Sequence, residues 1–218
     1  MKPILFNTEM VRAILDGRKT ATRRIIKPQP KFNIGSWSVV GRNPYQILTN
    51  GCGDSLKLSY QTGDILYVRE TFTVGKIDCG ELPDGRDDPY ISQCPGGNDI
   101  IPKEYAIRHD IGMDEVVWKP SIFMPKEAAR IFLRVTDVRA ERLQEISKDG
   151  CFSEGIDSDI WYKAFSYSAD KRISDKKIKS EFMRVWNGTI KKSDIDRYGW
   201  NANPFVWVYE FERTEKHD

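Results

Sequence analysis

The sequence has few of the residues that build metal sites or disulfide frameworks. Its 218 residues include only two histidines and four cysteines. The cysteines lie far apart, at Cys52, Cys79, Cys94 and Cys151. Structural zinc sites usually contain a C-x-x-C pair with histidines or further cysteines nearby. The pattern therefore argues against a zinc site, and we expect no bound metal.

Targeting and membrane-spanning segments are also missing. The opening residues, MKPILFNTEM, lack the apolar core and the cleavage site of a secretory signal. No apolar run approaches the roughly 20 residues that cross a bilayer as a helix. Without a secretory signal, the four cysteines are better interpreted as free thiols than as disulfides. We therefore expect a cytoplasmic protein with no membrane partner.

Neither sign of charge is in clear excess. The chain has 34 Lys plus Arg against 32 Asp plus Glu, for a formal charge of +2. A protein that coats DNA non-specifically usually carries a strong positive excess, so any nucleic-acid site here must be a local patch. Apolar material is sufficient, because hydrophobic residues make up 39% of the chain. Length and composition predict one domain over residues 1–218.

Periodicity predicts short strands with a few brief helices. Apolar residues at helical spacing predict a helix from Asn7 or Thr8 to Leu15, which Gly17 ends. Ser147 is expected to cap a second short helix that runs to Glu154. Further elements are predicted as strands over 19–26, 63–70, 131–138 and 204–211, and as a helix with Ile178, Phe182, Val185 and Trp186 on one face. The pattern favours an α+β fold in which a small twisted β-barrel carries short flanking helices.

The most informative segment is GRKTATRR, residues 17–24, where four cations and two hydroxyls lie between a helix end and a strand. This density indicates an anion site. On a regular strand Thr22 and Arg24 share one face, so Lys19 joins them only if the first residues still belong to the turn. The alternative is a solvated basic edge strand that discourages aggregation. We interpret Arg23 as solvated.

The same segment matches the G-x-K-x-x-x-x-R signature of the ASCH domain, a relative of the RNA-binding PUA barrel. Other blocks resemble the larger ASCH proteins of bacteriophages and prophages in matching order. They are KPILFNTEMVRAILDGRKT, GDILYVRET, WKPSIFMP, RIFLRVTDVRAERLQEIS, SEGI and NPFVWVYEF. The resemblance implies a PUA/ASCH-like barrel that interacts with RNA or with a modified nucleoside.

Small bacterial members that are similar at this motif are amidohydrolases, which remove the acetyl group from N4-acetylcytidine without a metal or organic cofactor. Their catalytic Lys, Thr and Glu map onto Lys19, Thr22 and Glu154, and the signature Arg maps onto Arg24. The compact members have no counterpart for residues near 31–60, 75–117 and 157–180, which we expect to be insertions. Related phage sequences also carry Asp-Ala where this chain has Gly150 and Cys151, which should loosen the helix before Glu154.

The chemistry of this residue set makes demands of its own. A threonine hydroxyl attacks an amide only if a nearby base takes its proton. Lys19 can be that base if its pKa falls from about 10.4 to near 7 or 8. Arg24 favours that fall, whereas Glu154 opposes it unless it acts on the leaving amine or orients the hydroxyl. Without the resemblance, Glu154 would be a surface residue at a helix end.

Residues outside this segment are weaker candidates. Tyr67 and Arg69 belong to the GDILYVRET block and share a strand face, so both are candidates to bind the substrate or RNA. Trp118, Trp200 and Trp207 can stack on a base, as aromatics do in single-strand readers, but core packing is the better interpretation for each.

Three functions remain open on sequence grounds. The first is an amidohydrolase acting on an N-acylated nucleoside such as N4-acetylcytidine. The second is a non-catalytic module that binds RNA or a nucleotide, and the third is a ribonuclease that works without a metal and stabilises a pentavalent phosphate with Lys and Arg. An amidohydrolase requires Lys19, Thr22 and Glu154 to converge in a small pocket, whereas a binding module requires an open basic groove.

Overall fold

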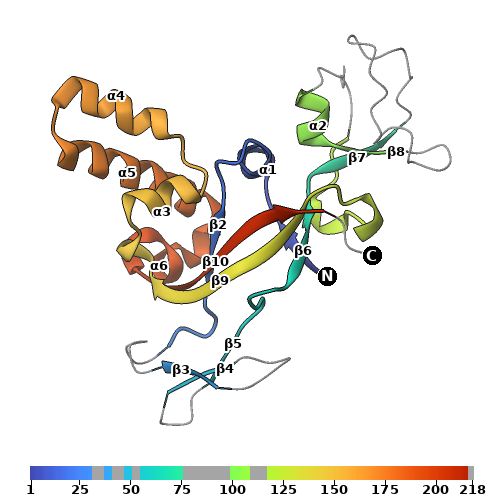
Figure 1. Ribbon diagram of the computed structural model, residues 1–218, viewed down its shortest axis with the longest axis horizontal. Helices are drawn as coiled ribbons and strands as arrows, with labels where there is room; N and C mark the ends of the chain where they lie inside the picture. The colour runs from blue at the N-terminus through green and yellow to red at the C-terminus, as the bar shows by residue number, and fades with distance from the viewer. Residues whose placement is uncertain (31–36, 41–46, 51–54, 76–98, 109–116, 216–218) are drawn as a thin grey trace.

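The computed structural model describes residues 1–30, 37–40, 47–50, 55–75, 99–108 and 117–215 (Figure 1). Its centre is a mixed five-stranded sheet in the order β1-β6-β9-β10-β2. The outer pair β1 and β6 is parallel and the other neighbours are antiparallel. The strands are β1 (Lys2–Leu5), β2 (Ala21–Ile25), β6 (Ile65–Arg69), β9 (Phe132–Arg142) and β10 (Phe205–Thr214).

Both faces of this sheet are covered, because strand β10 is apolar on each side. Its odd-numbered residues from Phe205 to Phe211 join a core with helix α1 (Thr8–Leu15), and its Val206 and Val208 join a second core. The second core includes residues of α3 (Lys148–Ser153) and α5 (Lys171–Thr189). An apolar run with no alternation is what a strand buried on two faces requires.

Among the described residues the sheet is open. Strands β1 and β2 are its two edges, and in the described residues no backbone ladder joins them. A side chain links them instead, since Nη2 of Arg24 in β2 donates to the carbonyl of Leu5 in β1 at 2.8 Å. A bulge between Glu210 and Phe211 breaks the register of β10 with β9, and such bulges bend a strand and increase its twist. The fold is α+β, and the closed barrel stays a prediction.

Helix α1 and the short helix α3 lie where the sequence predicts them. The side chain of Asn7 accepts from the backbone N–H of Met10, and Gly17 ends the helix with φ +74°. Ser147 caps α3 through the N–H of Gly150, and Glu154 is the C-cap. These caps follow directly from local residue chemistry.

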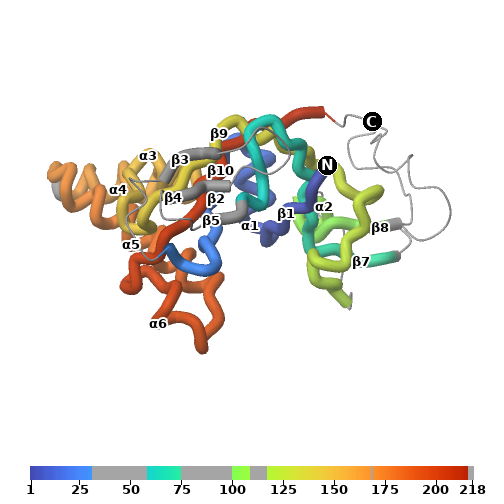
Figure 2. Tube along the Cα trace, turned by 90° about the horizontal axis from the view of Figure 1, so that it is seen from below, coloured from blue at the N-terminus to red at the C-terminus, as the bar shows by residue number. Residues whose placement is uncertain are grey.

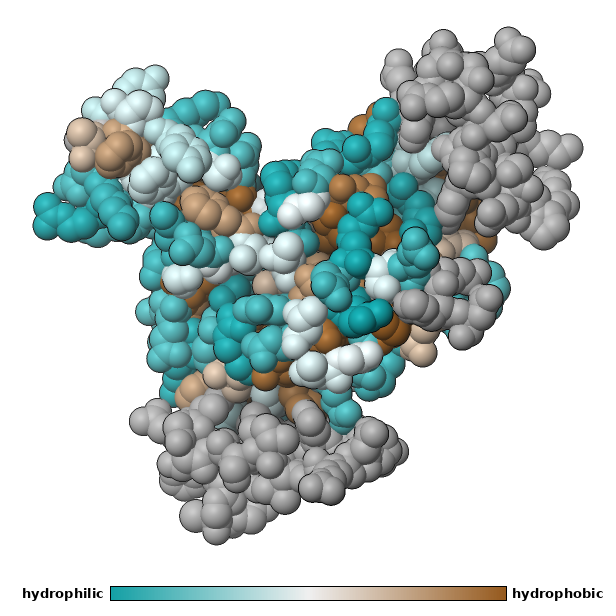
Figure 3. Space-filling model, viewed as in Figure 1, coloured by the Kyte–Doolittle hydropathy of each residue, from teal (hydrophilic) through white to brown (hydrophobic). Residues whose placement is uncertain are grey.

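The prediction of only brief flanking helices is wrong for residues 157–180. They form α4 (Ser158–Ser168) and the first half of α5, a helix of 19 residues. The indole N–H of Trp161 donates to Asp175 at 2.7 Å and ties the two helices together. Figures 1 and 2 show this pair at the opposite end of the molecule from β7, β8 and α2. In Figure 3 its surface is mainly hydrophilic, with hydrophobic side chains only in places.

Six further elements border segments outside the described residues. They are β3 (Trp37–Val40), β4 (Ile47–Asn50), β5 (Ser55–Lys57), β7 (Phe72–Gly75), β8 (Asp99–Pro102) and α2 (Lys103–Arg108). The short helix α6 (Ile195–Tyr198) lies between α5 and β10. Much of the predicted insertions near 31–60 and 75–117 therefore lies outside the described residues. Across the described ranges, no helix is both long enough and apolar enough to cross a membrane.

Candidate active site

Lys19 lies between α1 and β2, and its side chain is 0% exposed. The backbone reaches this position through Gly17, after which the N–H of Lys19 donates to the carbonyl of Ala13. The ammonium Nζ meets three acceptors, the carbonyl of Ala21 at 2.8 Å, the carbonyl of Glu154 at 2.9 Å and Oε2 of Glu154 at 2.7 Å. An ammonium has three protons, so every donor of a charged Lys19 is used.

Glu154 reaches Lys19 because α3 ends beside the edge of β2. The two residues form an isolated antiparallel bridge, and the Glu154 side chain is only 7% exposed. Gly155, with φ +94°, follows immediately and packs against α1 and Lys19. A Cβ at this glycine would lie 2.9 Å from Cβ of Ala13 and 3.2 Å from Cβ of Lys19. Gly155 therefore allows the close approach that brings Glu154 and Lys19 together.

We predict that Gly155→Ala costs more stability than the matched change Gly63→Ala. Gly63 also has a positive φ, +88°, but nothing lies within 4 Å of its added Cβ. Gly63→Ala should therefore cost only the left-handed backbone penalty, roughly 1 kcal/mol. Gly155→Ala adds a steric clash, for a loss of about 2–3 kcal/mol in urea unfolding. Equal losses would show that the contact with Ala13 and Lys19 is not tight.

The charges around Lys19 act in opposite directions. Burial lowers the pKa of Lys19, Glu154 opposes that fall, and the positive charges of Arg24 and Arg23 add to it. Burial acts this way because it penalises the charged form of a base. The result is a lysine that loses its proton more readily than a solvated one.

Thr22 shares a small pocket with Glu154. It is buried in β2, and together with Arg24 and Glu154 it lines a cavity of about 40 Å³. In the part of the chain that the structure describes, no hydrogen bond ties down the Thr22 hydroxyl. Side chains of α5, among them Phe182 and Trp186, complete the wall. The hydroxyl is thus placed beside Glu154 in a space that suits a small group.

Arg24 points to the α1 face of the sheet, with Thr22. Its guanidinium lies 5.3 Å from the ring centroid of Phe6 and bonds the carbonyl of Leu5. Burial lowers its pKa from the usual range. These contacts hold the Arg24 guanidinium in place at the site, and its Nη2 is already used in the hydrogen bond to Leu5 that links the two sheet edges.

The interpretation of Arg23 as solvated is wrong. Its side chain is 2% exposed and contacts two carboxylates, Glu141 of β9 and Glu154. The sequence carried one signal that would have revealed this. The unbroken apolar run of β10 predicts that both faces of the sheet are covered, and Arg23 is paired with Val208 of that strand.

Tyr67 and Arg69 lie away from Lys19, Thr22 and Glu154. Tyr67 packs with Ala129 and Phe132, on the sheet face opposite to the core residues Leu66 and Val68. Arg69 donates to the carbonyl of Ile122 at 3.0 Å and to the Tyr67 hydroxyl at 3.3 Å. Any role of these two side chains in binding would therefore be separate from the cavity at Thr22.

Trp118, Trp200 and Trp207 all pack against hydrophobic clusters, as the core-packing interpretation predicts. Trp207 is buried in the α1-side core, and Trp200 packs against the core on the other face. Trp118 packs against the small cluster that includes Tyr105. Among the described residues, no group of three or more His, Cys, Asp or Glu is placed to hold a metal ion.

Comparison of the chain with protein-family models, with curated proteins and with solved structures finds no match. The assignment of a function therefore depends on the chemistry of the site and on the resemblance of the sequence motifs.

Proposed function

We propose that this protein is an ASCH-type amidohydrolase that removes an acyl group from an N-acylated nucleoside such as N4-acetylcytidine. The observation that carries the proposal is the buried Lys19–Glu154 pair, because Glu154 also lines a small cavity together with Thr22. Burial of a lysine with a lowered pKa beside a nucleophile is the arrangement that amide hydrolysis needs. Free or RNA-borne nucleoside would be the partner.

In the proposed reaction, neutral Lys19 takes the proton of the Thr22 hydroxyl as its oxygen attacks the acetyl carbonyl. The charged Lys19 and Arg24 then lie beside the oxyanion that forms. The C–N bond breaks, the ammonium of Lys19 returns its proton to the leaving amine, and Thr22 carries the acetyl group as an ester. Water hydrolyses that ester to acetate and restores the hydroxyl. Glu154 holds Nζ of Lys19 in place through Oε2.

The cavity size supports an acyl substrate of small volume. A buried water needs on the order of 10–15 Å³ of such space, so a cavity of about 40 Å³ has room for an acetyl-sized group. The cytidine ring and the sugar would lie outside it, along the edge of β2. Longer acyl chains are excluded on this reasoning unless α5 moves.

A PUA-like barrel belongs to the same proposal. It is supported by the twisted mixed sheet with α1 packed against one face, and by the Arg24–Leu5 hydrogen bond between the two edge strands. The additional helices α4 and α5 would be the insertion that distinguishes this chain from compact amidohydrolases.

A second candidate is a binding module that breaks no bond. Two observations favour it. All three donors of Lys19 have partners, and the cavity of about 40 Å³ is well below the roughly 300 Å³ of a typical ligand pocket. The module would hold RNA or a nucleotide against the edge of β2 and Arg24.

The test measures release of acetate and cytidine from N4-acetylcytidine by the purified protein. We expect turnover by the wild type and a loss of at least about 100-fold in Thr22→Ala, since the nucleophile is gone. The matched control is Thr20→Ala, because Thr20 is exposed and only two residues away. It should retain activity within about twofold, as surface changes usually do.

Two results would decide against hydrolysis. One is a folded wild type that releases no acetate from the nucleoside or from an acetylated RNA. The other is equal activity in Thr22→Ala and Thr20→Ala. In either case, fluorescence anisotropy with a labelled RNA would test the binding module, which predicts weaker binding when Arg24 is changed to methionine.

A further inference from the structure

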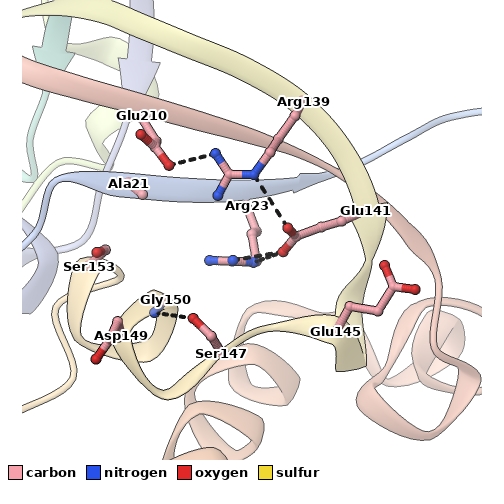
Figure 4. Close-up of a pocket in the computed structure, with 10 residues that line it drawn as sticks. All are labelled: Ala21, Arg23, Arg139, Glu141, Glu145, Ser147, Asp149, Gly150, Ser153 and Glu210. Carbon is pink, nitrogen blue, oxygen red and sulfur yellow. Dashed lines mark hydrogen bonds and ion pairs between the residues drawn. The ribbon is translucent and has the colours of Figure 1, made fainter.

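Arg23 connects the candidate active site to the opposite face of the sheet. Its Nε and Nη2 contact Oε1 of Glu141 at 2.8 and 2.7 Å, and its Nη1 contacts Oε1 of Glu154 at 3.1 Å. Figure 4 shows Arg23 and Glu141 beside a pocket of about 360 Å³, with Arg139 above them and α3 opposite. A buried guanidinium that serves two carboxylates is held firmly, because its planar fork is preorganised for such contacts.

Glu154 is shared between two cations on different sides of β2. Its Oε2 contacts Lys19, which sits near Phe6 on the α1 side, and its Oε1 contacts Arg23, which sits near Phe182 on the α5 side. One oxygen for each cation fixes the rotation of the carboxylate. Without Arg23, both oxygens of Glu154 would be free to turn toward Lys19.

The structure also makes room for Arg23. A Cβ at Gly150 would lie 3.1 Å from Nη2 of Arg23, closer than an ordinary contact. Gly150 therefore packs directly against the guanidinium. The glycine that weakens α3 in the sequence is the residue that lets α3 approach Arg23.

We propose that Arg23 is a positioning residue, which acts on Lys19 through Glu154 by holding one carboxylate oxygen away from the lysine. The proposal deepens the proposed function and rests on it for its catalytic meaning. Arg23 also lines the Thr22 cavity, but its hydrogen bonds are to the carboxylates of Glu141 and Glu154. It therefore positions Lys19 through Glu154, and acts on Lys19 directly only as a like charge. Glu141 of β9 holds the Arg23 guanidinium in place and so supports the contact of Arg23 with Glu154.

The charged groups that face Lys19 define what removal of Arg23 should do. Glu154 faces it from the end of α3, and Arg23 and Arg24 act on it from β2. Glu141 of β9 acts only through Arg23, and the neutral ring of Phe6 lies 5.6 Å from Nζ. Taking away Arg23 removes a like charge and frees Glu154, and both changes favour the charged lysine.

The experiment titrates Lys19 directly by NMR of ¹³C- and ¹⁵N-lysine-labelled protein, with the signal assigned by its loss in Lys19→Met. In Arg23→Met we expect the Lys19 titration midpoint to rise by about 1 in pH relative to wild type. The matched control is Arg139→Met, which removes a cation that also contacts Glu141 but does not contact Glu154. It should leave the midpoint unchanged.

Two further variants keep the test decisive. Glu141→Gln retains Arg23 but weakens the contact that anchors it, so we expect a smaller rise of the Lys19 titration midpoint. This variant tests the proposal even if Arg23→Met does not fold. Arg23→Lys keeps the positive charge, but a lysine cannot contact Glu141 and Glu154 as the planar guanidinium does. Its turnover should therefore be at least about 10-fold below that of the wild type, mainly through a lower kcat. Full rescue by lysine, or an unchanged midpoint in folded Arg23→Met and Glu141→Gln, would overturn the proposal.

The titration is independent of turnover. If the wild type hydrolyses nothing while the midpoint rises in Arg23→Met, the proposed reaction fails and the positioning of Lys19 by Arg23 stands. If the wild type is active and the midpoint does not move, the reaction stands and the role of Arg23 fails. Where both hold, the pH profile of kcat in Arg23→Met should shift to higher pH by the same amount as the midpoint.

Discussion

Arg130→Met is expected to lower the free energy of unfolding by about 3–5 kcal/mol, the largest stability effect that a single polar change should have here. Arg130 donates to Glu70 through Nε and Nη2 at 3.0 and 2.8 Å, and to Glu104 through Nη2 at 2.9 Å. Both carboxylates are buried. Methionine fills much of the same volume but leaves Glu70 without its cation, so the cost is that of an uncompensated buried charge.

The matched control for Arg130 is Arg139→Met. Arg139 contacts three carboxylates, Asp137, Glu141 and Glu210, where Arg130 contacts two, but the Arg139 side chain is 43% exposed. Exposed ion pairs of this kind contribute under about 1 kcal/mol, because water and salt screen them. Urea unfolding of both variants measures the difference. Similar losses in the two would mean that the Glu70–Arg130–Glu104 cluster is not the buried network that its geometry implies.

The loss in Arg130→Met should also depend on pH. Burial already raises the pKa of Glu70 in the folded protein, and Arg130 opposes that rise. Without Arg130 the folded-state pKa rises further above the unfolded value. Such a group keeps its contribution below the unfolded pKa and loses it as the pH rises through the folded pKa. The variant should therefore be closer to wild type at pH 5 than at pH 8, and the opposite trend would contradict this account.

The elements that the sequence predicts well are those whose ends depend on local chemistry. Asn7, Gly17 and Ser147 cap or end their helices through contacts with residues only a few positions away. Strand β9 was expected from alternation and β10 from its aromatic run, and both extend a few residues beyond the predicted ends. Local patterns locate such elements, while their ends depend on the partner strands.

The elements that the sequence does not predict depend on distant contacts. Residues 157–168 carry only a short apolar stripe, formed by Ile160, Trp161, Ala164 and Phe165. Helix α4 is held by α5 through pairs such as Trp161 and Asp175. The parallel pairing of β1 with β6 joins segments about sixty residues apart, by register pairs such as Ile4 and Val68. Neither contact leaves a local trace in the sequence, because each forms only when the chain has folded.

The candidate site was predicted in part. The motif resemblance selected Lys19, Thr22 and Glu154, and the structure places Lys19 against Glu154 and Thr22 in the cavity that Glu154 lines. Strand alternation alone put Lys19 on the face opposite to Thr22, and the pairing of Lys19 with Glu154 ahead of β2 explains why that rule does not apply. Arg23 was missed because its burial depends on helix α5 covering that face, which the residues of β2 do not show and only the apolar run of the neighbouring strand β10 indicates.

Lys19→Met should reduce turnover of N4-acetylcytidine by at least about 1,000-fold, the largest functional effect that we expect. The change removes the base that takes the Thr22 proton and keeps an unbranched side chain of similar length in the buried space. Residues that act as a unit are not additive, so the double variant with Thr22→Ala should be little worse than either single change. Initial rates of acetate release for the three variants measure this.

Turnover should depend on pH through the protonation of Lys19. Since only neutral Lys19 accepts a proton, wild-type turnover should rise with pH until Lys19 has titrated, at a pH below that of an exposed lysine because burial lowers the pKa of Lys19. Lys2→Met removes an exposed ion pair with Asp64 and should leave the rate unchanged. A folded Lys19→Met with activity within tenfold of Lys2→Met would mean that another group takes the proton. Glu154, already in the Thr22 cavity, would then be the first residue to change.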